Sequence, residues 1–550
     1  MGSKVKERIR ESWGENRRIT EGYDPALAAK CTNGIFVGRR KDSLLVFRGI
    51  PFARPPVGEL RWKKPQPAPD GDDVREAYYN GKTPIQTEWH SERASYYPQG
   101  EDCLYLNVWT APEAQPKGKT VMVFIHGGSY GWGGTADPLY DGENFVKAHP
   151  EIVLITIGYR VGLMGFVDFS QIEGGEAFPD APNLGIWDQI EALKWIRRNV
   201  EAFGGDPEKV TIFGESAGGG SVSILPFIPE AKGLFRRVIA ESGSAALTYS
   251  KEECADFTRR LIKETGAVDM RDLMLLSESK LMEFNEKLNY YNNFPQRDGV
   301  LIPEDPYAPY REGRTADIDM MIGTNADETN YWINEVGGFI PFRIGLPIQY
   351  ENDLRLLKPE DRERARQFMK MRGGYSLWKI SEFFTEIMFR LPAVRQAEEH
   401  SRNGGKVYMY YWKEHSRLPH LRACHAVELA YVFGNTEDTI YTGKPADPAL
   451  SRQVQDQWVR FAQTGDPGDE NLPWPAYETE ERWTMILAEN SGAEKDPLSE
   501  QRKLLDPILE YRLNASYADM DYNVPFVWKA AGKGLLLIAL IAFVLFMILK

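Results

Sequence analysis

The sequence contains few cysteines, and they show no metal-binding spacing. The four cysteines in its 550 residues are far apart, at Cys31, Cys103, Cys254 and Cys424. So few cysteines in so long a chain are typical of a protein from a reducing compartment, where thiols stay reduced.

The sequence also lacks clusters of basic residues, internal repeats and low-complexity tracts. Lysine and arginine are scattered, and the net charge is −13, which argues against nucleic acid as a partner. With 42% hydrophobic and 26% charged residues, the composition is that of an ordinary globular protein that can bury a large core.

A secretory signal is missing as well. The first eighteen residues, "MGSKVKERIRESWGENRR", carry charges throughout and contain no apolar stretch. We expect residues 1–20 to be a charged segment ahead of one large domain, residues 21–515.

The other end of the chain is apolar. Residues 534–549, "GLLLIALIAFVLFMIL", contain no charge and no polar side chain. We predict a linker over residues 516–529 and a membrane anchor helix over residues 530–550, with the membrane as a partner and the large domain in the cytoplasm. The alternatives are a helix that lies in one leaflet or one that docks on the protein.

The central part of the chain alternates between strand and helix patterns. Apolar runs of strand length occur in "TVMVFIHGG", "IVLITIGYR" and "KVTIFGES", and a helical spacing occurs in "NLGIWDQIEALKWIRRNV". Further strands are expected in "FRRVIAESG", "IDMMIGTN" and "KVYMYYW", with "WTMIL" at an edge. Strand, helix and strand in this order predict an α/β fold with a large, mostly parallel sheet. Residues 251–303 and 350–400 are helical and charged, so we expect insertions that cap the sheet.

Ser216 stands between glycines in "VTIFGESAGGGS", directly after a predicted strand. A Gly-x-Ser-x-Gly turn between a strand and a helix presents a serine at the top of a sheet, so Ser216 is a candidate nucleophile. A serine needs a base and an orienting acid. Of the downstream histidines, His425 enters an apolar segment and is preferred over His415 and His420. His400 has the pattern of a charged helix end.

The acid and the oxyanion donors come from two other loops. Asp327 and Glu328 follow the strand "MMIGTN", and spacing alone does not separate them. The backbone N–H of Ala217 and a glycine-rich loop after an earlier strand, Gly127 and Gly128 in "VFIHGGSYGWGG", are the expected donors to an oxyanion.

Several longer motifs are similar to those of the type-B carboxylesterase and cholinesterase family, in the same order and at similar spacing. They are "FRGIPFARPPVGELRWKKPQP", "EDCLYLNVW", "NLGIWDQ", "AFGGDPEKVTIFGESAGG" and "DQWVRFAQTGDP". The resemblance is strongest to bacterial para-nitrobenzyl esterase-like members. It implies an α/β-hydrolase fold with helical insertions that form a cap or gorge, no cofactor, no metal, and the following site: a triad of Ser216, Glu328 and His425, oxyanion amides on Gly127, Gly128 and Ala217, and supporting residues Glu215 and Ser242.

The sequence departs from the family pattern in three respects. Thr329 follows Glu328 where the family has glycine. The cysteine partners that secreted members use are missing, so the resemblance implies a free, buried thiol at Cys103 and no pair for Cys254. Arg93 stands where cholinesterases have a tryptophan that stacks on choline. A cationic substrate would meet a positive charge there, which argues against cholinesterase activity.

The prediction is a serine carboxylesterase of broad ester preference that acts through an acyl-enzyme, with a lipophilic small-molecule ester as substrate. One alternative is an amidase, thioesterase or acyl transferase with the same triad. The other is a catalytically silent, membrane-anchored binding or adhesion protein. The sequence gives no size preference for the acyl or alcohol group, and no oligomeric state.

Overall fold

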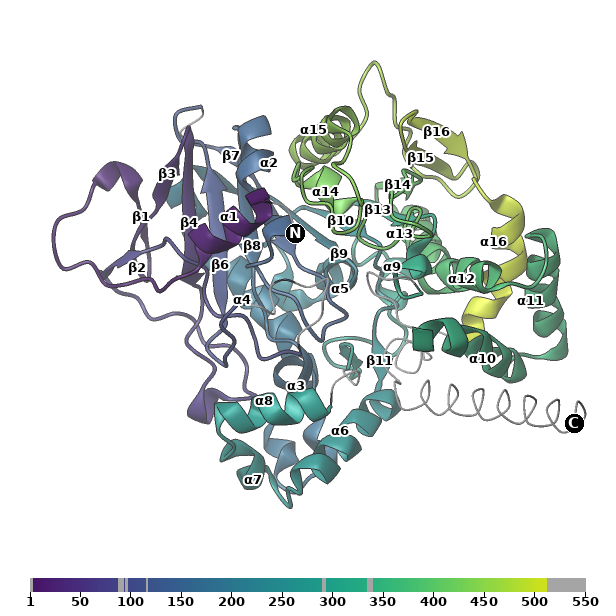
Figure 1. Ribbon diagram of the computed structural model, residues 1–550, viewed down its shortest axis with the longest axis horizontal. Coiled ribbons are helices and arrows are strands. Elements are labelled where there is room, and N and C mark those ends of the chain that lie inside the picture. Colours follow the sequence, from purple (N-terminus) through teal and green to yellow (C-terminus); the bar gives the residue numbers. More distant parts are fainter. Residues whose placement is uncertain are drawn as a thin grey trace, which may run out of the picture.

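The computed structural model describes residues 3–87, 93, 97–114, 117–288, 293–333 and 340–511. Within these residues, eleven strands form one twisted sheet in the order β16-β15-β14-β13-β10-β9-β7-β8-β6-β4-β3 (Figure 1). From one edge to the other the strands are β16 (Gly492–Lys495), β15 (Trp483–Leu487), β14 (Val407–Trp412), β13 (Asp319–Asn325), β10 (Arg237–Glu241), β9 (Gly205–Glu215), β7 (Lys119–Ile125), β8 (Ile152–Ile157), β6 (Tyr105–Thr110), β4 (Leu44–Pro51) and β3 (Arg39–Lys41).

The centre of the sheet is parallel and both of its edges are antiparallel. Adjacent strands from β15 through β8 pair in parallel. The pairs β15 with β16, β8 with β6, β6 with β4 and β4 with β3 are antiparallel. The α/β architecture with a mostly parallel central sheet is therefore as predicted, but the predicted edge strand "WTMIL", β15, is covered by β16. Two small sheets join β1 (Ala28–Cys31) with β2 (Gly34–Val37) and β5 (Val74–Glu76), and β11 (Tyr249–Ser250) with β12 (Gln296–Arg297).

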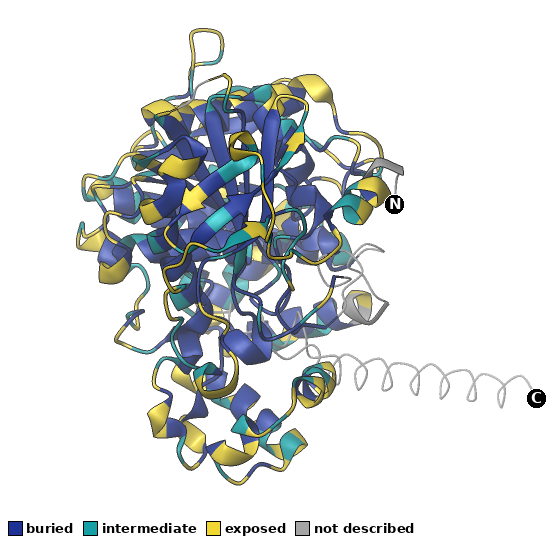
Figure 2. Ribbon diagram, turned by 90° about the vertical axis from the view of Figure 1, so that its left-hand side faces the viewer, coloured by how far each residue is buried: buried dark blue, intermediate teal, exposed yellow. Residues whose placement is uncertain are grey.

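Continuous apolar runs form the central strands because helices cover both faces of the sheet. Every residue of β7 and β8 is buried, as expected for a strand covered on both faces. In Figure 2 most of the sheet has the dark blue of buried residues, and exposed residues lie mainly on outer helices and loops. The helices that contact the sheet include α2 (Glu143–Ala148), α4 (Leu184–Asn199), α5 (Ala217–Ile224), α13 (Leu391–Arg402) and α15 (Pro448–Thr464).

The two predicted insertions are helical and lie at separate places on the molecule. In Figure 1 the first group lies at the lower edge and the second at the right. The first consists of α6 (Lys251–Thr265), α7 (Met270–Met274) and α8 (Glu278–Lys287), and the second of α10 (Ile340–Leu356), α11 (Pro359–Met371) and α12 (Leu377–Thr385). The remaining helices are α1 (Ser3–Ser12), α3 (Gly162–Gly165), α9 (Ala308–Arg311), α14 (Leu429–Val432) and α16 (Ser499–Leu505).

The predicted membrane localisation needs correction. The described residues include no helix with the length and apolar character that crossing a membrane requires. This finding contradicts the prediction of a single-pass membrane protein with a cytoplasmic catalytic domain, and the membrane as a partner is not supported. The predicted anchor, residues 530–550, and the linker, residues 516–529, lie outside the described residues. The division of the chain into a segment at residues 1–20 and a domain at residues 21–515 stays a prediction.

Candidate active site

Ser216 lies in a sharp turn between β9 and α5. Its backbone is left-handed, with φ 58° and ψ −119°, which is rare for a residue with a Cβ and is found at strained functional turns. Its N–H donates to the carbonyl of Glu241 at 2.8 Å, and its own carbonyl accepts from Gly220 at 2.8 Å. The turn needs glycine on either side, because a Cβ on Gly218 would lie 1.9 Å from the carbonyl oxygen of Ile125.

The glycine-rich loop after β7 lies against this turn. A Cβ on Gly127 would lie 2.8 Å from the carbonyl oxygen of Glu215 and 3.1 Å from the Cβ of Ser216. Gly128 has φ 103°, and a Cβ there would lie 2.2 Å from the carbonyl oxygen of Trp132. Only glycine allows these approaches. The structure therefore brings Gly127 beside Ser216 and Ala217, the first residue of α5.

His425 and Glu328 are in direct contact. The Nδ1 atom of His425 lies 2.7 Å from Oε2 of Glu328, and both side chains are buried. The other carboxylate oxygen of Glu328 accepts the N–H of Asn325 at 2.7 Å. Asp327 turns elsewhere, with its carboxylate 3.4 Å from the guanidinium of Arg422. The structure therefore places Glu328, and not Asp327, in contact with His425, a choice that the spacing in the sequence left open.

Glu215 and Ser242 also lie in this region. The Oε1 atom of Glu215 is 3.1 Å from Nε2 of His425, so the imidazole has a carboxylate near each ring nitrogen. Ser242 has a left-handed φ of 49°, and its N–H donates to the carbonyl of Gly323 at 2.9 Å. Its hydroxyl is buried and makes no hydrogen bond within the described part of the chain.

The other histidines downstream of Ser216 do not approach this site. His415 and His420 are exposed, and His420 stacks on Trp378 with 5.0 Å between ring centroids. His400 lies in the last turn of α13, as predicted, but the prediction that it is charged there is not supported. Its ring is buried, Nδ1 lies 3.0 Å from the hydroxyl of Thr315, and burial lowers its pKa.

Aromatic residues that the sequence did not indicate surround His425. The rings of Phe389 and Trp332 lie 5.0 Å and 5.2 Å from the imidazole centroid, and the ring of Tyr331 lies at 6.2 Å. Phe389 belongs to a π-helical turn (Glu386–Arg390) that follows α12. Such turns often occur at functional sites, but no sequence pattern marks this one.

Two more buried carboxyl groups lie behind the site, and the sequence did not single them out. Burial raises the pKa of Glu241 to about 7. A hydrogen bond of 2.7 Å from the indole N–H of Trp458 acts in the opposite direction and lowers the pKa, but burial has the larger effect. Burial and the nearby carboxylates of Glu328 and Glu241 raise the pKa of Glu428, which accepts from the Asn325 amide at 2.5 Å.

Arg93 is buried between two aspartates. Its guanidinium lies 2.8 Å from Asp137 and 2.6 Å from Asp438, with all three side chains at most 3% exposed. The charge that was predicted to meet a cationic substrate is therefore neutralised.

The described cysteines carry no disulfide, and no metal cluster accompanies them. Cys31, Cys103, Cys254 and Cys424 are all buried and free. Across the described ranges, no group of three histidine, cysteine, aspartate or glutamate side chains could hold a metal ion.

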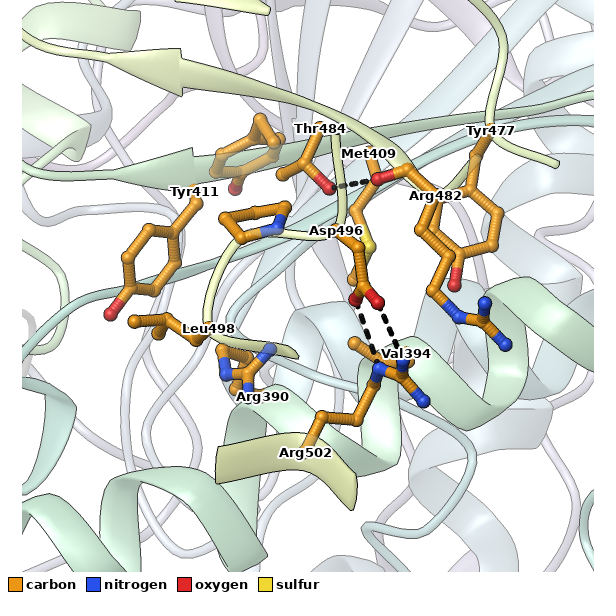
Figure 3. Close-up of a pocket in the computed structure, with 12 residues that line it drawn as sticks. Arg390, Val394, Met409, Tyr411, Tyr477, Arg482, Thr484, Asp496, Leu498 and Arg502 are labelled. Atoms are coloured by element: carbon orange, nitrogen blue, oxygen red, sulfur yellow. Dashed lines mark hydrogen bonds and ion pairs between the residues drawn. The ribbon is translucent and has the colours of Figure 1, made fainter. Parts of the chain in front are cut away.

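Figure 3 shows a separate small pocket between β14, β15, α13 and α16. Its side chains include none of the predicted site residues. Its arginines are already paired, Arg502 with Asp496 at 2.6 Å and Arg482 with Glu398 at 2.8 Å. These pairs hold the β15–β16 edge to the helices.

Comparisons with known proteins agree with the fold. Residues 25–504 match the model of the carboxylesterase family. The chain is 36% identical over 495 residues to para-nitrobenzyl esterase of Bacillus subtilis, covering 86% of this chain and 96% of that protein. It is 31% identical over 509 residues to liver carboxylesterase 1F of Rattus norvegicus, covering 82% and 88%. Carboxylesterase EST55 of Geobacillus stearothermophilus superposes with a TM-score of 0.78 at 33% identity, over 87% of this chain and 99% of that one.

The similarity to these relatives shows that the protein is a carboxylic ester hydrolase with the α/β-hydrolase fold. The predicted fold and resemblance are thereby confirmed. The chain belongs to the carboxylesterase family.

Proposed function

We propose that the protein is a serine carboxylesterase that hydrolyses esters through an acyl-enzyme on Ser216. In this proposal His425 accepts the Ser216 proton as the hydroxyl attacks the ester carbonyl, and Glu328 orients the imidazole and stabilises its protonated form. The backbone N–H groups of Gly127, Gly128 and Ala217 hold the oxyanion.

The reaction then runs in two halves. The protonated His425 gives its proton to the alcohol as the ester C–O bond breaks, and the acyl group stays on Ser216. Water attacks the acyl-enzyme with His425 again as the base, and the acid leaves as Ser216 regains its proton. Glu215 would add a second negative charge beside the imidazolium.

The observation that carries this proposal is the contact of 2.7 Å between His425 Nδ1 and Glu328 Oε2. A hydrogen bond from Nδ1 to Glu328 would leave Nε2, which lies 3.1 Å from Glu215 Oε1, as the nitrogen that accepts the proton. The elbow geometry of Ser216 and the apposed Gly127 support the same reading. The aromatic rings of Trp332 and Phe389 beside His425 favour apolar acyl or alcohol groups.

An amidase, thioesterase or acyl transferase would use the same residues, so matched ester, amide and thioester substrates separate these activities. A catalytically silent binding protein is disfavoured, since the nucleophile, base and acid are all present.

The test combines covalent labelling with turnover. The protein is incubated with a fluorophosphonate, its intact mass is recorded, and hydrolysis of a short p-nitrophenyl ester is measured for wild type and Ser216→Ala. We expect one adduct and turnover in wild type, and neither in the variant. Folded wild-type protein with no adduct and no turnover would refute the proposal.

A further inference from the structure

Thr329 occupies the place where the family resemblance leads one to expect glycine, directly after Glu328. It lies in a 3-10 turn (Glu328–Tyr331) and does not have a positive φ, so a side chain costs no backbone strain here. The question is what that side chain does.

We propose that Thr329, Ser381 and Thr385 form a positioning cluster that fixes the Glu328 carboxylate against His425. The inference rests on the proposed triad. It assigns α12, which belongs to the second insertion, a part in holding the acid.

The three hydroxyl groups are buried and mutually satisfied. Thr329 Oγ1 donates to the carbonyl of Ser381 at 2.6 Å and lies 3.1 Å from Thr385 Oγ1. Thr385 Oγ1 in turn accepts the N–H of Thr329 at 3.3 Å. Ser381 Oγ donates to the side-chain oxygen of Asn330 at 2.7 Å. All three hydroxyl residues are 1% exposed, so water does not compete for these bonds.

The opposite side of the same loop is bonded to the segment that carries His425. The N–H of His425 donates to the carbonyl of Glu328 at 3.2 Å, and the N–H of Asp327 donates to the carbonyl of Ala423 at 2.9 Å. The Asn330 amide reaches the carbonyl of Leu421 at 3.5 Å. The loop that carries Glu328 is therefore held between α12 and the segment that carries His425, and loss of the α12 bonds removes the contacts on one of these two sides.

The helix that carries Ser381 and Thr385 also reaches the base. α12 continues into the π-helical turn, where the ring of Phe389 lies 5.0 Å from that of His425. The same rigid element therefore contacts the neighbour of the acid at one end and the base at the other. A fixed distance between acid and base is what a triad requires.

The experiment compares Thr329→Val, which keeps the shape and loses the hydroxyl, with Thr329→Ser, which keeps the hydroxyl. The matched control is Thr258→Val in α6. Thr258 is also fully buried and donates to a backbone carbonyl, that of Asp168, at 2.6 Å. Each variant is assayed for kcat and KM on a p-nitrophenyl ester, and for thermal unfolding.

We expect Thr329→Val to lower kcat roughly tenfold with KM within about twofold, a smaller effect than the roughly hundredfold loss from a misplacement of about 1 Å. Thr329→Ser should keep kcat within about twofold of wild type, and Thr258→Val should lose thermal stability without losing kcat. A kcat of Thr329→Val within about twofold of wild type, or an equal loss in Thr258→Val, would overturn the proposal.

If Thr329→Val does not fold, Ser381→Ala decides, since it removes the contacts of the Ser381 hydroxyl with the side chain of Asn330 and with Thr329 Oγ1, both at 2.7 Å, and leaves Thr329 itself unchanged. A lower kcat at unchanged KM supports the cluster, and an unchanged kcat overturns it. Failure of the proposed function looks different, because wild type itself would then show no turnover.

Discussion

Glu241 is a buried acid whose ionisation should set the pH dependence of stability. Its carboxyl group is 0% exposed and accepts one hydrogen bond, from Trp458, while its other oxygen has no partner within the described residues. Burial therefore favours the neutral form and raises the pKa from 4.5 to about 7.

The sign follows from the proton count. Below about pH 4.5 the carboxyl is protonated in both the folded and unfolded states, and the stability that comes from the raised pKa is fully present. As the pH rises to about 7 the unfolded state ionises while the folded state keeps its proton, so stability falls. Above that pH the loss is complete, and a rise of this size corresponds to about 3 kcal/mol.

Glu241→Gln tests this reasoning because it has the shape of the protonated acid and cannot ionise. Unfolding entropy of about 2 cal/mol/K per residue gives roughly 1 kcal/mol/K for this chain, so the full effect is a Tm difference of about 3 °C. We expect the variant to match wild type near pH 5 and to melt about 3 °C higher at pH 8.5.

The measurement is thermal unfolding of both proteins by circular dichroism from pH 5 to pH 8.5 in the same buffer series. Glu208→Gln serves as control, because Glu208 is an exposed acid in a surface pair with Arg197; its Tm difference should not follow the pH. A Glu241→Gln difference that is constant across the series, or that shrinks as the pH rises, would refute the assignment of a neutral buried acid.

Three further predictions concern the site and its supports. Gly127→Ala should lower kcat roughly 100-fold or more without unfolding the protein, since its Cβ would push the oxyanion loop away from Ser216; a normal kcat would exclude Gly127 as a donor. Arg93→Met should lower the free energy of unfolding by about 3–5 kcal/mol, because it leaves two buried aspartates without their ion-pair partner. The control Arg40→Met breaks an exposed ion pair and should cost less than about 1 kcal/mol, with both variants measured by thermal unfolding. A thiol reagent should titrate none of the four cysteines in the folded protein and all four after unfolding, with activity unchanged by reductant; fewer than four in the unfolded protein would reveal a disulfide.

The residues that sequence analysis could place are those whose geometry is local. The turn at Ser216 and the approach of Gly127 depend on glycines at fixed offsets, so the printed motif determines them. The choice between Asp327 and Glu328 came from the family resemblance, because both occupy one short loop. Only the position of His425 across the site shows which carboxylate reaches it.

Residues defined by contacts between distant segments could not be placed in this way. Glu241 and Glu428 are ordinary carboxylates in the sequence, and their shared burial arises where β10 meets the segment after His425. The predicted charge on His400 is not supported for the same reason. Its neighbours along the chain are charged, but its ring packs directly on Gly405, where a Cβ would lie 2.3 Å from it. Burial of the ring lowers its pKa, and the charged residues next to His400 in the sequence do not reveal that burial.

The contacts of Arg93 with distant residues also bear on substrate selection. The sequence predicted that the charge of Arg93 repels a choline ester. In the structure two aspartates, Asp137 at 2.8 Å and Asp438 at 2.6 Å, outweigh that charge, and the three side chains together have a formal charge of −1. Repulsion therefore cannot be the basis of discrimination. What the position lacks is an aromatic face, and a desolvated cation on such a face gains about 2 kcal/mol. The lack of this contact should therefore lower kcat/KM for a cationic ester by only about 30-fold relative to an enzyme that has the aromatic face, and the preference between cationic and neutral esters should be independent of ionic strength. A preference that weakens steeply with added salt would restore the electrostatic explanation.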